Sequence, residues 1–282
     1  MRMKFVISGG TGFIGRHILT RLRRDGHHVA LWSRHGEPQL DVLNGADAVL
    51  HLAGEPVAQR WTEQAKQRIR DGRVMGTRRL VGSIAAASPR PKVLVSTSAI
   101  GFYGDRGDEI LSEISQPGTG FLADVCQGWE AEADRATAFD VRVTKLRVGF
   151  VLGKEGGALA QMLPIFRLGL GGRLGSGKQW MPWIHVDDVA DLFVHAATTE
   201  IHGVWNATAP NPVTNDIFTK EMAGVIHRPA IFPVPRFALS LGFGEFGGHM
   251  LDSARVIPAH ALQAGYEFRY PELGQALRNL LT

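Results

Sequence analysis

The sequence predicts an α/β protein built on a Rossmann-type, doubly wound parallel sheet, with a smaller, discontinuous C-terminal substrate lobe. Three observations predict this fold. A short apolar run, Phe5–Ile7, leads through a glycine-rich turn into an amphipathic helix. Apolar runs of strand length then alternate with helical patterns up to residue 153, which is typical of a parallel sheet. Beyond that point glycine and proline become frequent. We therefore expect a sheet domain of residues 1–152 and 184–207 and a small lobe of residues 153–183 and 208–282.

The composition of the 282 residues is that of an ordinary globular protein, with 44% hydrophobic and 21% charged residues. The net charge of +4 is spread along the chain, so we expect no nucleic-acid partner. A single cysteine excludes an intrachain disulfide and a cysteine-based zinc site, and we expect no bound metal. The sequence has neither a signal-peptide pattern nor a run of about 18 apolar residues. We therefore expect a cytoplasmic protein with no membrane partner.

The turn after the first strand carries Gly10, Gly12 and Gly15 in the pattern G-x-G-x-x-G, with Gly9 before them. Apolar side chains then recur at intervals of four, which places a helix directly after the turn. A pyrophosphate group needs glycine here because its oxygens approach the backbone closely, at the positive end of a helix dipole. The turn therefore predicts dinucleotide binding. The alternative is a tight turn with a structural role alone.

The residues after the second strand favour NADP over NAD. NAD-binding enzymes usually place an Asp or Glu about 20 residues beyond the glycine turn, where it binds the ribose hydroxyls. This chain has Ser33 and Arg34 instead, a hydroxyl donor and a guanidinium that can bind a 2′-phosphate through two hydrogen bonds. The alternative is that Arg34 is a solvated surface charge.

Further strands are expected at 48–54, 93–98 and 145–153, and helices at 61–87 and 122–136. The carboxyl ends of these parallel strands should face the bound nucleotide.

Three further polar residues have expected roles. Ser98 ends a strand in a hydroxyl and is a candidate donor to a substrate oxygen. His51 lies inside an apolar run and is expected to be a hydrogen-bonded core histidine. His185 precedes Asp187 and Asp188; we expect one aspartate to cap a helix over 189–197 and His185 to be structural.

The motifs of the chain resemble the extended type of the short-chain dehydrogenase/reductase superfamily, to which nucleotide-sugar epimerases belong. Within it, the chain is similar to an atypical "epimerase family" subgroup of NADP-binding proteins. The segments that carry the resemblance span the whole chain; they are 9–15, 52–56, 98–104, 169–179, 183–188 and 206–210, followed by 255–258 and 264–268 in the small C-terminal domain.

The resemblance implies a set of cofactor contacts. The glycine turn would hold the pyrophosphate, and the pair after the second strand would bind the adenosine 2′-phosphate. The end of the third strand would lie over the ribose, an arginine in the next helix would lie nearby, and the strand before the second lobe would approach the nicotinamide. The implied NADP(H) contacts are Gly9, Thr11, Gly12, Phe13, Ile14, Gly15, Ser33, Arg34, Leu52, Ala53, Gly54, Arg73, Ser96, Gly149, Phe150 and Val151.

The superfamily's usual catalytic pair, Tyr-x-x-x-Lys on one helix face, occurs nowhere in this chain. The alignment that the resemblance implies puts Cys126 and Glu130 in the two positions. A carboxylate cannot replace the lysine, because it would raise the pKa of a neighbouring acid instead of lowering it. Three explanations stay open: modified acid–base chemistry by Ser98 and Tyr103, a role for Cys126 as nucleophile or acid, or NADP(H) binding without redox turnover.

The segment Gly172–Lys178 fits G-x-x-x-x-G-K, but Gln179 follows where a phosphate loop has Ser or Thr, and no buried strand precedes it. We reject a nucleotide triphosphatase and expect a flexible wall of the substrate crevice, in which Lys178 and Trp180 meet an anionic or aromatic substrate or are simply solvated and packed.

Two functions are compatible with these observations. The first is an NADP(H)-dependent oxidoreductase or epimerase, acting on a small carbonyl or alcohol or on a nucleotide-sugar-like substrate. The second is a non-catalytic NADP(H)-binding redox sensor or interaction protein. The resemblance also implies a possible homodimer through helices such as 61–87 and 122–136.

Overall fold

The computed structural model describes residues 2–33 and 40–282, and it confirms the predicted fold class. A central sheet of six parallel strands has the order β10-β6-β4-β3-β1-β2. The strands of this sheet are β1 (Lys4–Ser8), β2 (His28–Trp32), β3 (Ala48–His51), β4 (Val93–Ala99), β6 (Arg142–Val148) and β10 (Gly203–Ala207). The strand order reverses between β1 and β3, which is where open sheets of this class bind ligands.

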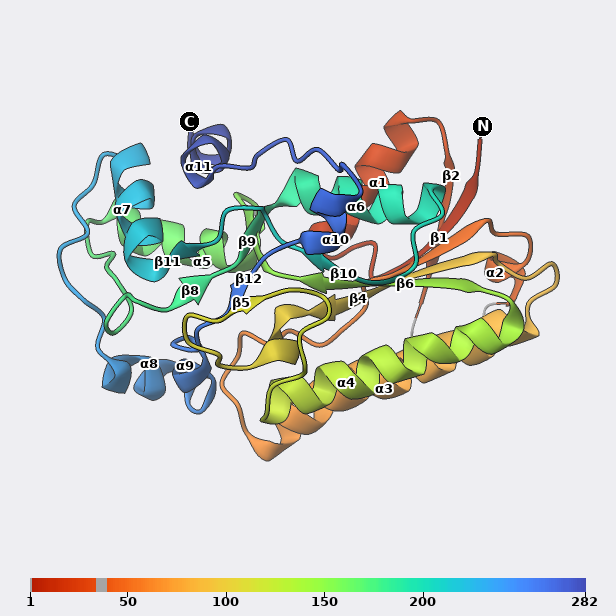
Figure 1. The fold of residues 1–282 in the computed structure, drawn as a ribbon, viewed down its shortest axis with the longest axis horizontal. Coiled ribbons are helices and arrows are strands. Elements are labelled where there is room, and N and C mark those ends of the chain that lie inside the picture. Colours follow the sequence, from red (N-terminus) through yellow and green to blue (C-terminus); the bar gives the residue numbers. More distant parts are fainter. Residues whose placement is uncertain (1, 34–39) are drawn as a thin grey trace.

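Helices cover both faces of the sheet (Figure 1). One face carries α1 (Phe13–Arg24), α6 (Val186–Thr198) and α10 (Ala259–Gln263); the other carries α3 (Glu63–Ala86) and α4 (Phe121–Asp134), with the short α2 (Leu40–Leu43) and the 3-10 helices η1 (Ile100–Tyr103) and η2 (Arg135–Phe139) joined to them. The long helix α3 confirms the helix predicted for 61–87.

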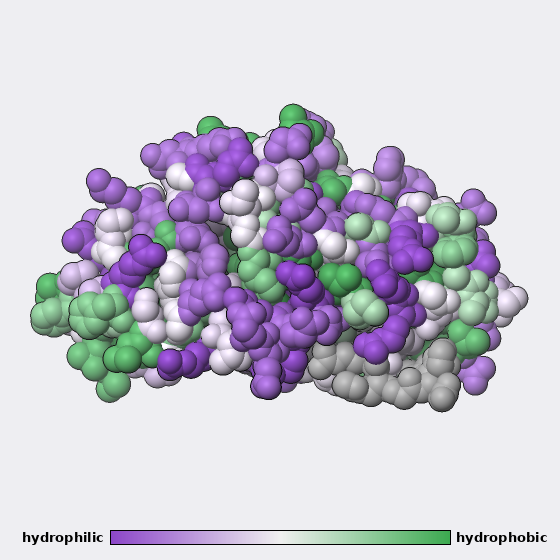
Figure 2. Space-filling view, turned by 90° about the horizontal axis from the view of Figure 1, so that it is seen from below, coloured by the Kyte–Doolittle hydropathy of each residue, from purple (hydrophilic) through white to green (hydrophobic). Residues whose placement is uncertain are grey.

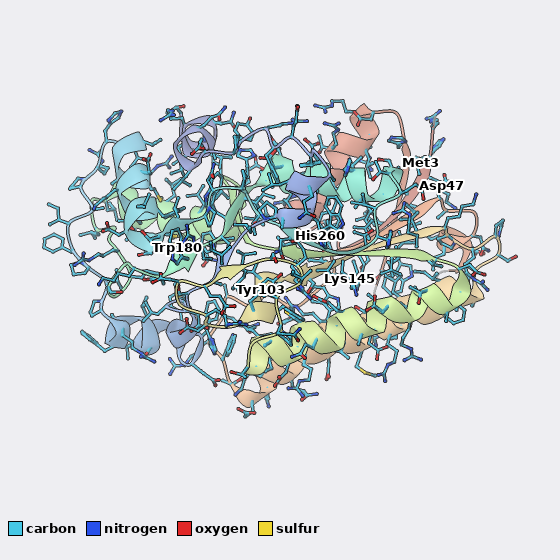
Figure 3. The ribbon with its side chains drawn as sticks, in the orientation of Figure 1. Met3, Asp47, Tyr103, Lys145, Trp180 and His260 are labelled. Atoms are coloured by element: carbon cyan, nitrogen blue, oxygen red, sulfur yellow. The ribbon has the colours of Figure 1, made fainter. Side chains whose placement is uncertain are left out.

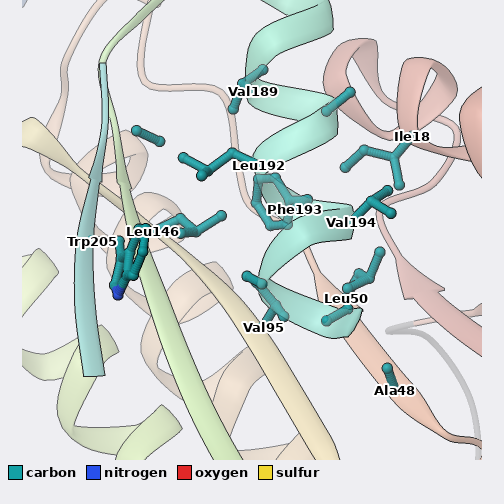
Figure 4. Close-up of a cluster of buried hydrophobic side chains, with 14 of the residues drawn as sticks. Ile18, Ala48, Leu50, Val95, Leu146, Val189, Leu192, Phe193, Val194 and Trp205 are labelled. Atoms are coloured by element: carbon teal, nitrogen blue, oxygen red, sulfur yellow. The ribbon is translucent and has the colours of Figure 1, made fainter. Parts of the chain in front are cut away.

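The alternation of side chains along β1 explains the two cores. Phe5 and Ile7 point to the α1 and α6 face, where they join a cluster containing Leu50, Leu192 and Phe193 (Figure 4). Val6 points to the opposite face and packs with residues of α3 and the segment after α4. Because both faces are buried, the strands are continuous apolar runs, as parallel sheets require.

The rest of the chain forms a second lobe at one end of the sheet (Figure 1). Its elements are β5 (Ile110–Leu111), β7 (Phe150–Gly153), α5 (Gly157–Arg167), β8 (Trp180–Met181), β9 (Trp183–His185), β11 (Val213–Thr214), α7 (Asn215–Val225), α8 (Arg236–Phe243), α9 (Phe246–His249), β12 (Arg255–Val256) and α11 (Leu273–Leu281). Three two-stranded sheets, β7-β9, β8-β11 and β5-β12, tie it together. The lobe has its own core, with Trp183 and Phe218 fully buried.

Two local predictions were wrong. The single strand expected over 145–153 is two strands, because Gly149 ends β6 and β7 then leaves the main sheet to pair with β9.

The aspartate cap is also wrong: α6 begins at Val186, and the imidazole Nδ1 of His185 accepts the capping hydrogen bond from the Asp187 N–H at 3.0 Å. Asp188 instead accepts from the backbone N–H groups of Arg269 and Tyr270 and so fastens the C-terminal segment to the sheet domain. His185 is structural, as expected.

No helix in the described part of the chain is long and apolar enough to cross a bilayer.

Candidate functional site

The glycine turn joins the carboxyl end of β1 to α1, and its backbone is packed too tightly for side chains. Gly9 has a φ of +80°, and a Cβ atom there would lie 2.7 Å from the backbone nitrogen of Ala53. A Cβ atom at Gly15 would lie 2.3 Å from the carbonyl oxygen of Gly9. The N–H of Gly12 donates to that same carbonyl at 3.0 Å. Glycine is therefore required here by close backbone contacts as well as by φ.

The first turn of α1 fits an anionic group. Among the described residues no side chain caps α1 at Gly12, and its first turn contains no acidic residue. The free N–H groups and the helix dipole point out of the turn, so the turn can receive a pyrophosphate. Thr11 is exposed in the turn, and Ile14 packs against the core.

Phe13 connects this turn with the second lobe, a contact that the sequence did not predict. Its ring lies against three glycines at the start of that lobe: Cβ atoms at Gly153 and Gly156 would lie 2.4 and 2.5 Å from ring carbons, and one at Gly157 would lie 3.1 Å away. Gly157 has a φ of +69°. These glycines therefore make space for the ring of Phe13.

The end of β3 adds a second wall beside the turn. Leu52, Ala53 and Gly54 follow this strand, and the backbone of Ala53 is the part that Gly9 touches. The guanidinium of Arg73 donates to the carbonyl oxygen of Glu55 at 2.8 Å and lies 5.2 Å from the ring of Trp129. Burial lowers the pKa of Arg73.

The predicted 2′-phosphate site is described only in part. Ser33 follows β2 immediately, at the sheet's carboxyl edge. Arg34 lies outside the described residues, so its predicted role stays a prediction.

His51 is a core histidine, as the sequence predicts. It is 1% exposed, and its two ring nitrogens lie 2.9 Å from the hydroxyls of Ser8 and Thr77. Burial lowers its pKa to about 4. Ser8, His51 and Thr77 thus form a neutral hydrogen-bonded chain across β1, β3 and α3.

This burial predicts an acid sensitivity of folding. Because the folded pKa of His51 is about 4 and the unfolded value is 6.5, the unfolded chain binds the extra proton between these pH values. The free energy of unfolding should therefore fall by about 3 kcal/mol through this one group as pH drops from 7 to 4. The His51→Gln variant should lack this component, as measured by urea unfolding across that pH range. The exposed control His202→Gln should keep the native pH profile; parallel profiles for His51→Gln and the native protein would refute the assignment.

Ser98 lies at the end of β4, and its hydroxyl donates to Oε1 of Glu130 on α4 at 2.6 Å. Arg147 on β6 clamps the same carboxylate from the other side, with Nε to Oε1 at 2.8 Å and Nη2 to Oε2 at 2.9 Å. The side chains of Glu130 and Arg147 are 8% and 4% exposed. Burial alone would lower the pKa of Arg147, but the hydrogen bonds and charge of Glu130 outweigh it and raise that pKa. Ser98 is therefore joined to a buried, charge-neutralised carboxylate.

Tyr103 extends this network toward the second lobe. Its hydroxyl donates to Oδ1 of Asn206 at 2.7 Å and accepts from Nη1 of Arg147 at 3.0 Å. The side chain has no exposed surface and lies in the interior of the molecule (Figure 3). Burial raises its pKa, which Arg147 and Asn206 partly offset. Asn206 in turn donates from Nδ2 to the carbonyl oxygen of Ile257.

Cys126 is placed close to this group but is a poor nucleophile. It is 3% exposed and packs with Phe102 and Tyr103. Burial, and next the negative charge of Glu130, raise the pKa of its thiol to about 11. The thiolate is therefore scarce at neutral pH.

The other predicted contacts lie within β4 and at the carboxyl end of β6. Ser96 is buried within β4, opposite His51 in the parallel register. Gly149 separates β6 from β7, and a Cβ atom there would lie 2.5 Å from the carbonyl oxygen of Pro182. Phe150 and Val151 then begin β7, and the N–H of Phe150 donates to the same carbonyl at 2.7 Å.

A cleft of about 310 Å³ opens where the segment after η1 meets the glycine-rich segment 169–178; it is lined by Asp105, Gly107, Asp108, Ser176, Lys178, Gln179, Leu251 and Ser253. Trp180, labelled in Figure 3, stands beside this cleft: its indole N–H donates to Asp108 at 2.8 Å, and the guanidinium of Arg255 lies 4.3 Å from its ring. Trp180 is therefore a packed indole, and Lys178 lines the cleft.

Sequence reasoning missed Arg147, Glu113 and Asn206, although Glu130 was placed at the usual lysine position. Glu113 accepts from the backbone N–H of Asn206 at 2.9 Å and of His260 at 3.3 Å. A signal for Arg147 was present: an arginine within an otherwise apolar strand has to find a buried partner. Nothing in the sequence indicates that the partner is Glu130.

Comparison with known proteins gives the following findings. A family model described as the NAD dependent epimerase/dehydratase family matches residues 5–207, and a domain of unknown function (DUF1731) matches residues 234–280. The chain is 39% identical over 303 residues to the chloroplastic homolog of epimerase family protein SDR39U1 from Arabidopsis thaliana. The alignment covers 99% of this chain and 87% of that protein.

Among the solved structures that are similar over the whole chain are two at 35% and 34% identity. The human epimerase family protein SDR39U1 (isoform 2) with NADPH has a TM-score of 0.93 and 35% identity, with 99% of each chain covered. The nucleoside-diphosphate sugar epimerase from Corynebacterium glutamicum has a TM-score of 0.82 and 34% identity, covering 100% of this chain and 58% of that one.

Proposed function

Because the chain belongs to the NAD dependent epimerase/dehydratase family, we propose that it binds NADP(H) and acts as an oxidoreductase or epimerase on a small alcohol or carbonyl compound. The observation that carries the proposal is the turn Gly9–Gly15, whose tight backbone and uncapped helix form an anion site. The NADPH in the human relative's structure, at 35% identity over the whole chain, supports the choice of cofactor. The name of the Corynebacterium glutamicum relative supports nucleotide-sugar-like substrates as one class.

The residues of this chain would hold the cofactor along the carboxyl edge of the sheet. The glycine turn takes the pyrophosphate, Ser33 and Arg34 take the 2′-phosphate, and the segment Leu52–Gly54 lies over the ribose. The segment Gly149–Val151 takes the nicotinamide end. When bound, NADP(H) exchanges a hydride with the substrate.

Proton transfer falls to Ser98 in this proposal. Its only proton is donated to Glu130, so its oxygen is free to accept one. As the substrate's C–O bond becomes C=O, the hydroxyl proton passes to Oγ of Ser98, and the serine's own proton passes to the Glu130 carboxylate. Arg147 holds that carboxylate in place. An ionised Glu130 carboxylate suits oxidation of an alcohol, because it can accept the proton. Reduction of a carbonyl needs the proton to start on Glu130.

A second function is favoured by a different observation. Ser98 is 1% exposed and Tyr103 has no exposed surface, and both hydroxyls are bonded internally. The Ser98–Glu130–Arg147 group would then be a structural network, and the chain a non-catalytic NADP(H)-binding redox sensor or interaction protein.

Turnover separates the two functions. Purified protein would be given NADP+ with a panel of small alcohols and nucleotide sugars. NADPH formation, followed by absorbance, measures oxidation, and separation of the sugar epimers measures epimerisation, which regenerates the cofactor. We expect turnover that falls about 10² to 10⁴-fold in Ser98→Ala, because proton transfer is lost, while NADPH affinity is kept. The control Ser83→Ala removes a serine of α3 whose hydroxyl donates to the carbonyl oxygen of Arg79 in the same helix, and it should leave turnover unchanged. Undiminished turnover in Ser98→Ala would refute the relay, and NADPH binding without turnover on any substrate would favour the sensor.

A further inference from the structure

We propose that one end of the second lobe docks onto an anionic lipid bilayer. The surface consists of residues 165–173, from α5 and the segment after it, and residues 228–241, from the segment before α8 and most of α8. We call it the lobe-end surface. This inference is independent of the cofactor and of any catalytic role, and it departs from the expectation, based on composition, of no membrane partner.

The two segments of the lobe-end surface are held together by backbone contacts. The N–H of Val234 donates to the carbonyl oxygen of Arg173 at 2.8 Å. The side chain of Arg228 donates from Nε to the carbonyl oxygen of Arg167 at 3.1 Å. Gly172 lies so close to the carbonyl of Phe232 that a Cβ atom would be 1.7 Å from its oxygen. The surface is therefore one built unit, although its halves lie about sixty residues apart in sequence.

Large apolar side chains gather on this surface. The structure gives 13 exposed large hydrophobic residues in the described part of the chain, and seven of them lie here; their exposed fractions are Ile165 51%, Leu168 75%, Leu170 61%, Ile231 75%, Phe232 67%, Phe237 73% and Leu241 76%. Green spheres cluster correspondingly at the left end of Figure 2, where α8 and the segment before it lie. A patch of this kind indicates an interaction site.

The charge of the surface is of one sign. The two segments contain the exposed arginines Arg167, Arg173, Arg228 and Arg236 and no aspartate or glutamate. The nearest carboxylate to Arg173 belongs to Asp216, at 4.0 Å, so that arginine is partly neutralised. Apolar side chains surrounded by arginines fit a partner that is apolar inside and negatively charged at its surface.

The shape favours a bilayer over the other partners. Side chains that are 61 to 76% exposed stand out from the surface, and the segment between α7 and α8 forms the end of the molecule in Figure 1. Peptides dock into grooves, whereas protruding apolar side chains insert between lipid headgroups. A second copy of the chain is disfavoured because two such surfaces would bring arginines face to face. Attachment would be peripheral, through the lobe end.

Vesicle sedimentation tests the proposal. We expect the full chain to bind vesicles of phosphatidylcholine with 30% phosphatidylserine at low salt, to bind pure phosphatidylcholine at least 10-fold more weakly, and to lose binding as salt rises. The variants Phe232→Ser/Leu241→Ser and Arg167→Gln/Arg236→Gln should each weaken binding at least 10-fold. These side chains are exposed, so thermal unfolding should stay close to native.

The matched controls place the same changes elsewhere. Met75→Ser/Ile114→Ser and Arg79→Gln/Arg135→Gln alter exposed residues outside the surface and should bind vesicles as the native protein does. Absence of vesicle binding at low salt overturns the proposal, as does equal loss in controls and surface variants. Light scattering gives a further test. The proposal would also be overturned if the native protein were a dimer that does not bind vesicles and if the serine variant of the surface were a monomer; the surface would then serve self-association.

Discussion

Replacing Gly15 by alanine is expected to abolish NADPH binding. The new Cβ atom would lie 2.3 Å from the carbonyl oxygen of Gly9 and 2.7 Å from the Cα of Gly10, and these are backbone atoms that cannot rotate away. The turn has to open, so the N–H groups at the start of α1 lose their alignment with the pyrophosphate. Fluorescence titration with NADPH should show a loss of at least about 100-fold in affinity, since several charge-assisted hydrogen bonds are misplaced together.

Neighbouring glycines provide a graded series. Gly12→Ala brings its Cβ to 3.2 Å from the same carbonyl and should weaken binding less than Gly15→Ala. Gly82→Ala on α3 meets nothing within 4 Å and should leave binding unchanged, while favouring its helix slightly. Circular dichroism checks that Gly15→Ala is folded. Native NADPH affinity in folded Gly15→Ala would rule out the turn as the pyrophosphate site.

Replacing Arg147 by methionine is expected to cost about 3 to 5 kcal/mol of unfolding free energy, because it leaves the Glu130 carboxylate buried without its cation. The pair is bidentate and almost fully excluded from water. Arg147 also lies 3.3 Å from the ring centroid of Phe102 and donates a hydrogen bond to Tyr103. The substitution therefore also removes contacts that hold η1 in place. Urea unfolding at pH 7 measures the effect.

Two further variants distinguish an unpaired charge from lost packing. The double variant Glu130→Leu/Arg147→Met removes both charges and should recover most of the stability that Arg147→Met loses. Arg135→Gln breaks an ion pair with Glu132 in which the arginine is 60% exposed, and it should change stability little. The assignment would be refuted if Arg147→Met were as stable as the native protein. It would also be refuted if the double variant Glu130→Leu/Arg147→Met were no more stable than Arg147→Met, because an unpaired buried carboxylate would then not be the cause of the loss.

Local sequence predicted those parts of the fold and site that depend on neighbouring residues. The glycine motif Gly9–Gly15 leads from β1 into the first turn of α1 as expected, because its φ requirement and the helix start are both set within a few residues. The helix α3 and the parallel strands followed from apolar periodicity. The core role of His51 followed from its apolar surroundings. The cofactor contacts that the resemblance implies stay predictions, and Arg34 lies outside the described residues.

The tertiary structure alone decided which distant residues meet. Arg147 pairs with Glu130 across 17 residues, and Tyr103 reaches Asn206 across 103 residues, distances at which spacing carries no information. Gly149 ends β6 because Pro182 approaches its backbone, and Phe13 occupies space left by glycines near residue 155. The sequence by itself thus determined the nucleotide-binding half, whose contacts are local. Packing determined the Ser98–Glu130–Arg147 network and the lobe end, because buried charges and exposed apolar groups acquire partners only when separate segments fold together.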